Sequence, residues 1–352
     1  MGSGRATRVA LALFRDRRLF NAFAARWLAQ LDRRFGRGGS RLARILVTGA
    51  AGFIGRALCR GLVERGHEVL GWTRTPAEPI PGAELRPLGD IGPLTSWSEH
   101  LAPVDIVIHL ANRAHRPVRA GAEQQEAEAA AALALGAAAC GVRRLVHMSS
   151  VRAMGEATQP GVPFRPTDPP QPREAYGRAK LATEQALLAA ARQTGLELVI
   201  LRPPLVYGPA VTANFRALIR LAASGLPLPF AGIDNRRSLI FLDNLVDVAV
   251  RASLQPVAAG HVLLVRDAVD LSTAELVCAL AAGLGRPVRL FAMPEAVFAT
   301  LRRLPLFGPL VARLTLSLQV DDSATRTLLD WAPPVSPEAG LAATARAFRH
   351  RM

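Results

Sequence analysis

The chain has 352 residues, half of them hydrophobic, which is enough to bury the core of one wide domain or of two closely packed ones. Eleven arginines and two aspartates in residues 1–44 supply nine of the 15 net positive charges. The remaining residues are only mildly basic, which argues against nucleic-acid binding as their main role, and the seven histidines form no spacing typical of a metal site.

Residues 1–43 form a basic N-terminal arm that differs in composition from the rest of the chain. Its apolar side chains recur at helical spacing, at Phe20, Phe23, Trp27, Leu31 and Phe35. This pattern predicts an amphipathic helix that makes weak contact with an anionic membrane surface or covers an apolar patch of its own protein. A transit peptide and an extension without a role are the other two interpretations. The glycine-rich joint at residues 36–40 predicts that the arm is dispensable for folding.

A glycine-rich turn follows the first predicted strand. Arg44–Val47 is typical of a short buried strand, and Thr48–Gly55 reads TGAAGFIG. Three glycines let the backbone turn tightly and approach a pyrophosphate, which would rest on the amide groups of the next helix: Gly49, Gly52 and Gly55. A second strand at His67–Thr73 supplies the context that this motif requires, so the turn predicts a dinucleotide-binding Rossmann domain.

The middle of the chain contains a long apolar run, Ala129–Val142. Its 14 residues are too few to cross a bilayer and suit a helix packed on the sheet or on a partner subunit. The three cysteines are far apart and have apolar neighbours, which predicts buried, reduced thiols in a cytosolic protein: Cys59, Cys140 and Cys278.

Lys180 is the only lysine of the chain and follows Tyr176, one of two tyrosines, by four residues. Arginine therefore fills every other basic position, which indicates that a guanidinium cannot replace the compact ammonium group at this one. On a helix the two side chains share a face, and the ammonium would lower the tyrosine pKa from about 10 toward neutrality. The pair predicts a general acid–base. Standing alone, it would be a chance Tyr-x-x-x-Lys on a solvated helix.

Six further segments extend this pattern from Arg44 to the C-terminus. They are Gly89–Ile91, Val104–Ala111, Val146–Gly155, Leu201–Pro209, Arg236–Val246 and Ser317–Pro333. Together with the glycine turn and the Tyr176–Lys180 pair, they resemble the extended short-chain dehydrogenase/reductase family. The resemblance is closest to the NAD-dependent epimerase/dehydratase branch, which acts on nucleotide-activated sugars. The last segment is similar to the C-terminal strand and helix of this family, with Asp330 where glycine is usual.

The resemblance implies an α/β fold. A doubly wound parallel Rossmann sheet would span residues 44–203, and residues 204–352 would form a smaller C-terminal α/β part that binds substrate, with the last Rossmann strands interleaved. It further implies a cytoplasmic homodimer that pairs through two long helices, expected at Glu123–Cys140 and Tyr176–Thr194.

The resemblance also implies a bound nicotinamide dinucleotide. The residues expected to contact this cofactor are Gly49, Gly52, Phe53, Ile54, Gly55, Thr73, Arg74, Asp90, Ile91, Leu110, Ala111, Tyr176, Lys180 and Pro203. In this family the second strand usually ends in an acidic residue that binds the ribose hydroxyls, whereas here it ends Thr73-Arg74. A guanidinium without that carboxylate suits a 2′-phosphate, which favours NADP(H) over NAD(H).

The catalytic set implied by the resemblance is Ser150, Tyr176 and Lys180. Tyr176 would exchange a proton with the sugar oxygen, Lys180 would bind the nicotinamide ribose, and Ser150 would hold the same sugar oxygen. Three other residues would bind the nucleotide sugar, with Asn214 and Arg237 on phosphate and Phe230 on the base.

Departures from the family pattern narrow the expected reaction. Dehydratases carry an Asp-Glu pair after the catalytic residue, whereas Ser150 precedes Val151-Arg152, so dehydration is not expected. We predict reduction of a nucleotide (UDP) 4-keto-6-deoxy-hexosamine, a step of bacterial surface-polysaccharide precursor synthesis. The alternative is a UDP-glucose or UDP-N-acetylglucosamine 4-epimerase. A non-catalytic nicotinamide-binding protein is the minor alternative.

Overall fold

The computed structural model describes residues 42–90, 92, 97–101, 103–111, 122–211, 213–305 and 307–349. Residues 43–352 form one compact unit by themselves. The helix expected within the N-terminal arm lies outside the described residues, as does Ile91.

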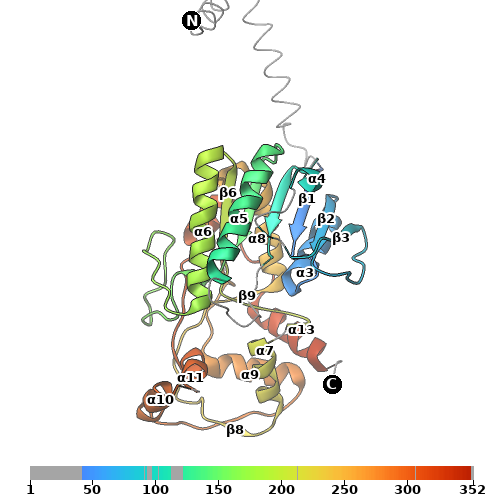
Figure 1. Ribbon diagram of the computed structural model, residues 1–352. Helices are drawn as coiled ribbons and strands as arrows, with labels where there is room; N and C mark the ends of the chain where they lie inside the picture. Colours follow the sequence, from blue (N-terminus) through green and yellow to red (C-terminus); the bar gives the residue numbers. More distant parts are fainter. Residues whose placement is uncertain are drawn as a thin grey trace, which may run out of the picture. The chain divides into compact units, whose positions relative to one another are not determined.

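A parallel sheet of seven strands forms the centre of this unit, in the order β10-β6-β5-β4-β1-β2-β3 (Figure 1). The strands are β1 (Arg44–Thr48), β2 (Glu68–Thr73), β3 (Ala83–Pro87), β4 (Ile106–His109), β5 (Arg144–Met148), β6 (Glu197–Arg202) and β10 (Val262–Leu264). The strand order reverses between β1 and β4, and the carboxyl ends of strands at such a reversal form a ligand-binding crevice. The predicted doubly wound Rossmann sheet is confirmed.

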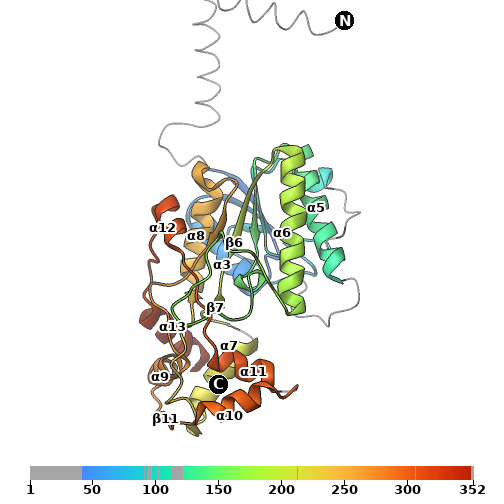
Figure 2. The same cartoon turned by 90° about the vertical axis from the view of Figure 1, so that its left-hand side faces the viewer.

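Helices cover both faces of the sheet (Figures 1 and 2). Their bounds are α3 (Phe53–Glu64), α4 (Ser98–Leu101), α5 (Ala122–Ala139), α6 (Ala175–Thr194), α8 (Leu242–Leu254) and α12 (Ser323–Leu329). Ile45 of β1 packs in one apolar cluster with side chains of α3 and α8. Its neighbour Leu46 packs in another with side chains of α5 and α6. This alternation follows from the two-residue period of a strand whose two faces are both buried.

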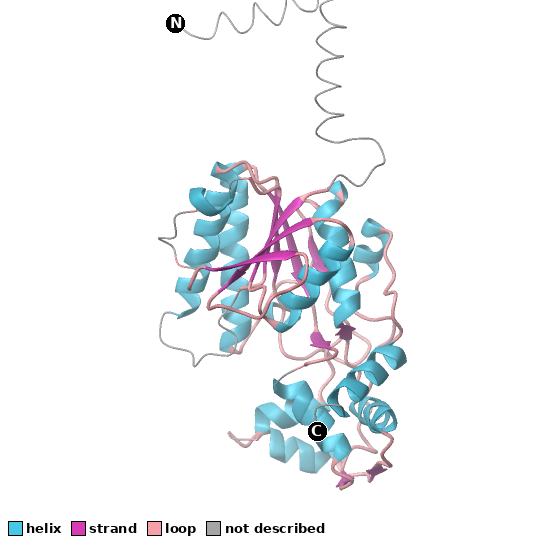
Figure 3. Ribbon diagram, turned by 90° about the vertical axis from the view of Figure 1, so that its right-hand side faces the viewer, coloured by secondary structure: helices cyan, strands magenta, loops and turns pink. Residues whose placement is uncertain are grey.

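The remaining elements gather beyond the carboxyl ends of the sheet strands (Figure 3). They are α7 (Ala213–Ala223), α9 (Thr273–Leu284), α10 (Glu295–Arg302), α11 (Gly308–Thr315) and α13 (Pro337–Arg349), with two short strand pairs, β7 (Leu205–Tyr207) with β9 (Leu239–Phe241) and β8 (Pro227–Leu228) with β11 (Arg289–Leu290). A separate apolar cluster, which includes Tyr207 and Phe215, forms their core. The sheet also takes β10 from beyond residue 203. The domain boundaries given above stay predictions.

Arg144 ties the sheet to α8 at the end opposite the crevice. Its buried guanidinium donates to Glu197 Oε2 at 2.7 and 2.9 Å and to the carbonyl oxygens of Ala252, Ser253 and Gln255 at 2.6–3.1 Å. These carbonyls lie at the C-terminal end of α8, where they have no partners within the helix. Arg144 therefore has a structural role that the sequence did not indicate.

Two expectations from the sequence are wrong in detail. No strand forms at the start of Ser317–Pro333, because Leu318 and Val320 make only single bridges, to Arg237 and to Phe164. The cysteines are not all buried, since Cys140 is half-buried and Cys278 is exposed, although all three are free thiols. Burial raises the pKa of the Cys59 thiol to about 12.

The C-terminal closing helix ends in an unusual conformation. Asp330, which stands where the family usually has glycine, adopts a left-handed conformation with φ of 45° after α12. Glycine is the usual residue at such a helix end because it has no Cβ. The carbonyl oxygen of Asp330 accepts a hydrogen bond from Arg251 Nη1 at 3.3 Å.

No helix in the described part of the chain is long and apolar enough to span a bilayer. Within the same residues, no group of three or more His, Cys, Asp or Glu side chains is arranged to hold a metal ion.

Candidate active site

The glycine turn between β1 and α3 is shaped to receive phosphate groups. Gly49 has φ of +71°, and a Cβ at this position would lie 3.1 Å from the Ala111 amide nitrogen. A Cβ on Gly55 would lie less than 3.0 Å from the Gly49 backbone. Gly52 begins α3, whose N-terminus has no side-chain cap and no acidic residue in its first turn. Free amides at a positive helix end fit the pyrophosphate of a dinucleotide, so Gly49, Gly52, Phe53, Ile54 and Gly55 suit the role predicted for them.

The carboxyl ends of β1 and β4 are joined beside this turn. Thr48 Oγ1 accepts from the Leu110 and Ala111 amides, at 3.2 Å each, and lies 2.8 Å from His109 Nδ1. With both amides donating, the threonine hydroxyl donates to His109 Nδ1, which places the proton of the neutral ring on Nε2. Leu110 and Ala111 therefore lie against the glycine turn, and their contact with a cofactor stays a prediction.

The end of β2 carries no carboxylate. Thr73 is buried, and its hydroxyl faces the Arg86 carbonyl oxygen at 3.5 Å. Arg74 is exposed at the strand end, and Asp90 is exposed in the loop after β3. The contacts predicted for Thr73, Arg74 and Asp90 stay predictions.

Ser150 is positioned by an extension of the β5–β6 pairing. The Ser149 amide donates to Leu201 O at 2.8 Å, and the Val151 amide donates to Pro203 O at 2.9 Å. Ser150 then begins a short 3-10 helix, η1 (Val151–Ala153), and its hydroxyl oxygen accepts from the Arg152 amide at 3.2 Å. The sequence thus places Ser150 and Pro203 on adjacent segments at the carboxyl end of the sheet.

Helix α6 brings Tyr176 and Lys180 to the same region. Gly177 is buried, and a Cβ there would lie less than 3.0 Å from the Arg152 carbonyl oxygen and from Pro172 Cβ. The first turn of α6 therefore packs directly on η1, which puts Tyr176 beside the segment that begins with Ser150. The sequence analysis did not single out Gly177, although its place directly after the tyrosine was visible.

Lys180 is 1 % exposed, and its Nζ lies 3.5 Å from Glu126 Oε1 of α5. Behind it, His109 and His147 stack at 5.5 Å between ring centroids. Burial, reinforced by the Lys180 charge, lowers the pKa of His109 to about 3 and the pKa of His147 well below its usual value. Neither nitrogen of His147 has a hydrogen-bond partner among the residues that the structure describes. Both rings are therefore neutral, and the Lys180 ammonium carries a positive charge beside them.

A buried ion pair, Glu184 with Arg202, connects the segments that carry Ser150 and Lys180. Glu184 lies one helical turn beyond Lys180 on the same face of α6 and accepts from Arg202 Nε at 3.0 Å. Ser149, next to Ser150, donates its hydroxyl to Glu184, and Arg202 Nη1 lies 2.6 Å from the sulfur of Met154. This network links β6, α6 and both ends of η1. The sequence analysis missed it, because only the spacing of Glu184 from Lys180 was visible.

Arg237 is held between two distant segments of the C-terminal part. Its amide donates to Leu271 O at 3.0 Å, its carbonyl oxygen accepts from the Leu271 amide at 3.1 Å, and Nη1 donates to Leu316 O at 2.9 Å. Burial, together with the charges of Arg152 and Arg313, lowers the pKa of Arg237 to about 10. No carboxylate of the described residues forms an ion pair with it, so Arg237 is a buried cation with capacity for an anion.

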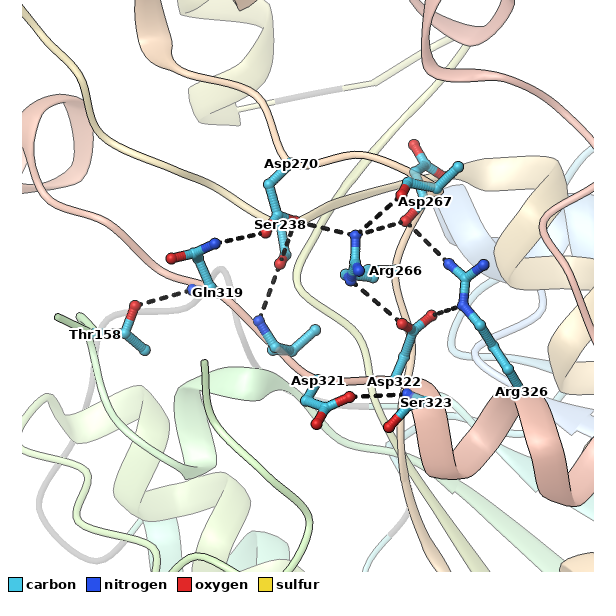
Figure 4. Close-up of polar contacts among 12 residues, drawn as sticks. Thr158, Ser238, Arg266, Asp267, Asp270, Gln319, Asp321, Asp322, Ser323 and Arg326 are labelled. Carbon is cyan, nitrogen blue, oxygen red and sulfur yellow. Dashed lines mark hydrogen bonds and ion pairs between the residues drawn. The ribbon is translucent and has the colours of Figure 1, made fainter. Parts of the chain in front are cut away.

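The polar network of Figure 4 fixes the segment that carries Arg237. Asp270 accepts from Ser238 Oγ at 2.7 Å and from Gln319 Nε2 at 2.8 Å. Arg266 connects Asp270 to Asp322, at 3.5 and 3.2 Å. Since Ser238 follows Arg237 directly, these bonds set the position of the arginine.

The other two predicted substrate residues are less defined. Phe230 is 4 % exposed and lies in the apolar cluster of the C-terminal part, so its contact with a base stays a prediction. The side chain of Asn214, near the start of α7, lies outside the described residues.

Comparisons with known proteins agree with this geometry. Residues 45–265 match the NAD dependent epimerase/dehydratase family. The chain is 38% identical over 311 residues to a UDP-glucose 4-epimerase of Vibrio cholerae, covering 86% of this chain and 95% of that one. It is 30% identical to a UDP-glucose 4-epimerase of Mycolicibacterium smegmatis, covering 88% and 99% of the two chains.

The fold has close counterparts among solved structures. A UDP-glucuronic acid 4-epimerase from Bacillus cereus, in complex with UDP-glucuronic acid and NAD, superimposes with a TM-score of 0.70 at 23% identity, over 88% of this chain and all of that one. The family match, the two relatives and the arrangement of the glycine turn with Ser150, Tyr176 and Lys180 lead to one conclusion: the chain belongs to the NAD-dependent epimerase/dehydratase family of extended short-chain dehydrogenases/reductases.

Proposed function

We propose that the protein is an NAD-dependent 4-epimerase of a UDP-sugar. The observation that carries the proposal is the 38% identity to the Vibrio cholerae UDP-glucose 4-epimerase over nearly its whole length. The presence of Ser150, Tyr176 and Lys180 on adjacent segments at the carboxyl ends of the strands supports it. The same comparison favours the epimerase alternative over the reductase that the sequence analysis preferred.

A bound nicotinamide would supply reversible hydride chemistry at the sugar C4, and the glycine turn from Gly49 to Gly55 would hold the pyrophosphate of that cofactor. Tyr176 would accept the proton of the 4-hydroxyl and give it back after the sugar has turned. Lys180 would hold the tyrosine in its proton-accepting form, and Ser150 would orient the reacting oxygen. No net proton or reductant is consumed in this cycle.

A 4-keto reductase that consumes NADPH is the second candidate. One observation favours it, namely that β2 ends in Thr73 with the exposed Arg74 beside it and without a carboxylate. A 2′-phosphate would gain a charge-assisted hydrogen bond from that guanidinium. Two relatives with names of related redox enzymes match about half of the chain, among them a dTDP-4-dehydrorhamnose reductase of Mycolicibacterium smegmatis at 32% identity.

The state of the purified protein separates the two candidates. The epimerase should retain NAD through purification and interconvert UDP-glucose and UDP-galactose, or their N-acetyl forms, without added cofactor. Arg74→Ala should leave this activity within about twofold. The reductase would instead retain little nucleotide and oxidise NADPH stoichiometrically with a UDP-4-keto sugar. In that case Arg74→Ala would weaken the binding of NADPH, and not of NADH, by about ten- to a hundred-fold, which is the contribution of a hydrogen bond to a charged group.

A further inference from the structure

Two arginines from different parts of the chain pair with one carboxylate beside the segment that carries Ser150, and a third arginine lies near them. Arg152 Nη1 lies 3.7 Å from Glu174 Oε1, and Arg313 Nη2 lies 3.2 Å from Glu174 Oε2. Glu174 is the residue that precedes α6, two positions before Tyr176. Arg237 joins the group through Leu316, the residue that ends α11, to whose carbonyl oxygen it donates.

The group has many more hydrogen-bond donors than acceptors. An arginine carries five N–H donors. The guanidinium of Arg152 donates no hydrogen bond to any described residue, although its side chain is only 16% exposed. Among the described residues, the guanidinium of Arg237 donates one hydrogen bond, and the buried Nε of Arg313 has no partner. Enclosed guanidinium donors without acceptors are costly, so the arrangement suits an anionic ligand.

The position of Arg152 separates its role from that of the other two arginines. Its amide donates to Ser150 Oγ, and its carbonyl oxygen touches Gly177, next to Tyr176. Arg237 and Arg313 both belong to the C-terminal part, where they can balance the two charges of a nucleoside diphosphate. Arg152 instead lies at the end of the site where the sugar ring reacts. Glu174 and Glu156 act on it through their charges without accepting a hydrogen bond, so its donors are left for a group on the sugar.

We propose that Arg152 determines substrate specificity by binding an acidic group on the sugar ring, so that the substrate is a nucleoside diphosphate hexuronate. The inference rests on the proposed function, because it places the reacting sugar at Ser150 and Tyr176. Glu174 is hydrogen-bonded to Arg313 but lies 3.7 Å from Arg152, and a ligand carboxylate at hydrogen-bond distance replaces it at Arg152. A bidentate guanidinium–carboxylate pair then fills donors that the protein leaves free.

The test compares two sugars that differ only at C6. UDP-glucuronate carries a carboxylate there, and UDP-glucose carries a hydroxymethyl group. The wild-type protein should show a kcat/KM for 4-epimerisation at least about tenfold higher with the uronate, and Arg152→Gln should reduce that value about ten- to a hundred-fold while changing the value for UDP-glucose less than about threefold. Arg236→Gln is the matched control, since this arginine pairs with Glu275 instead, and it should leave both values unchanged.

Equal losses on both sugars in Arg152→Gln would overturn the inference, because they would mean that Arg152 binds the diphosphate or only supports the fold. A wild-type preference for UDP-glucose would overturn it as well, even if the variant failed to fold. Arg152→Lys, which keeps the charge without the fork, should retain part of the preference for the uronate.

A lack of epimerase activity would contradict the proposed function and can be distinguished from a failure of the inference about Arg152. If neither sugar were epimerised, calorimetric binding of both nucleotides to the wild-type protein would still test the inference, with tighter binding of UDP-glucuronate expected. Equal affinities would then contradict it.

Discussion

The groups around Lys180 determine the electrostatic effect of its charge on Tyr176. Two stacked histidines lie behind it, and burial keeps both rings neutral, whereas the guanidinium of Arg152 is a second cation that interacts electrostatically with Tyr176. One carboxylate, Glu126, lies 3.5 Å from Nζ and balances part of its charge. The electrostatic field of the Lys180 ammonium at Tyr176 is therefore reduced by the opposing field of the Glu126 carboxylate.

Substitutions at Tyr176 and Lys180 test the catalytic set. Tyr176→Phe should keep the fold and cofactor binding but lose at least about 100-fold in kcat, the usual contribution of a positioned acid–base group. Lys180→Arg should also be severely impaired although it keeps the charge, because the wider fork does not fit the enclosed position. Steady-state kinetics and retained NAD are the measurements. Wild-type turnover in Lys180→Arg would contradict the assignment of the lysine.

At the scale of elements, the contact between α6 and η1 sets the distance between the tyrosine and the serine. Gly177→Ala should separate them, because the new methyl group meets the Arg152 carbonyl oxygen, which has no freedom to move aside. We expect a loss of about 1–3 kcal/mol in the free energy of unfolding, as in other overpacked sites, and a larger relative loss in kcat. Gly232→Ala is the control, since its methyl group would find only ordinary contacts at 3.7 Å and beyond. Equal kcat values in the two variants would contradict this role of Gly177.

The sequence predicted those elements whose signals are local. The glycine turn, β1 and β2 lie within a residue or two of their expected positions, because each carries its own apolar run or turn residues. Helices α5 and α6 lie equally close to the bounds that the family resemblance implied. The Glu184–Arg202 pair and the arginines around Glu174 were not predicted, since they join residues far apart in the chain. The strand expected before α12 failed for a related reason. Its residues pair singly with Arg237 and Phe164, and sequence periodicity does not report such partners.

For the whole molecule, the compact unit begins at Ala43 and β1 begins at Arg44. A protein that starts at Arg41 should therefore fold and keep its activity, since no sheet strand is removed. Circular dichroism and the epimerase assay are the measurements. Loss of folding would instead show that the apolar side chains of the arm belong to the core. Co-sedimentation of only the full-length protein with anionic vesicles, weakened by salt, is what the membrane-contact prediction requires.

The two buried histidines make the stability of the molecule depend on pH. The folded-state pKa of His109 is about 3 and that of His147 is also far below 6.5, the usual value in an unfolded chain. Below pH 6.5 the unfolded chain thus binds protons that the folded protein does not. The contribution of the two neutral histidines to stability is therefore fully present above this pH and is lost as the pH decreases toward their folded-state pKa values. Each histidine contributes up to about 1.4 kcal/mol per pH unit to the loss.

His147→Leu isolates one of these contributions. Leucine fills a similar volume and removes two buried nitrogens that have no partner, so the variant should be at least as stable as the wild type at pH 7.5. Between pH 7.5 and pH 5.0 the wild type should lose about 2 kcal/mol more than the variant in the free energy of unfolding, measured by urea titration. Identical losses in both proteins would mean that His147 is protonated in the folded state. The assignment of His109 and His147 as a neutral pair would then be wrong.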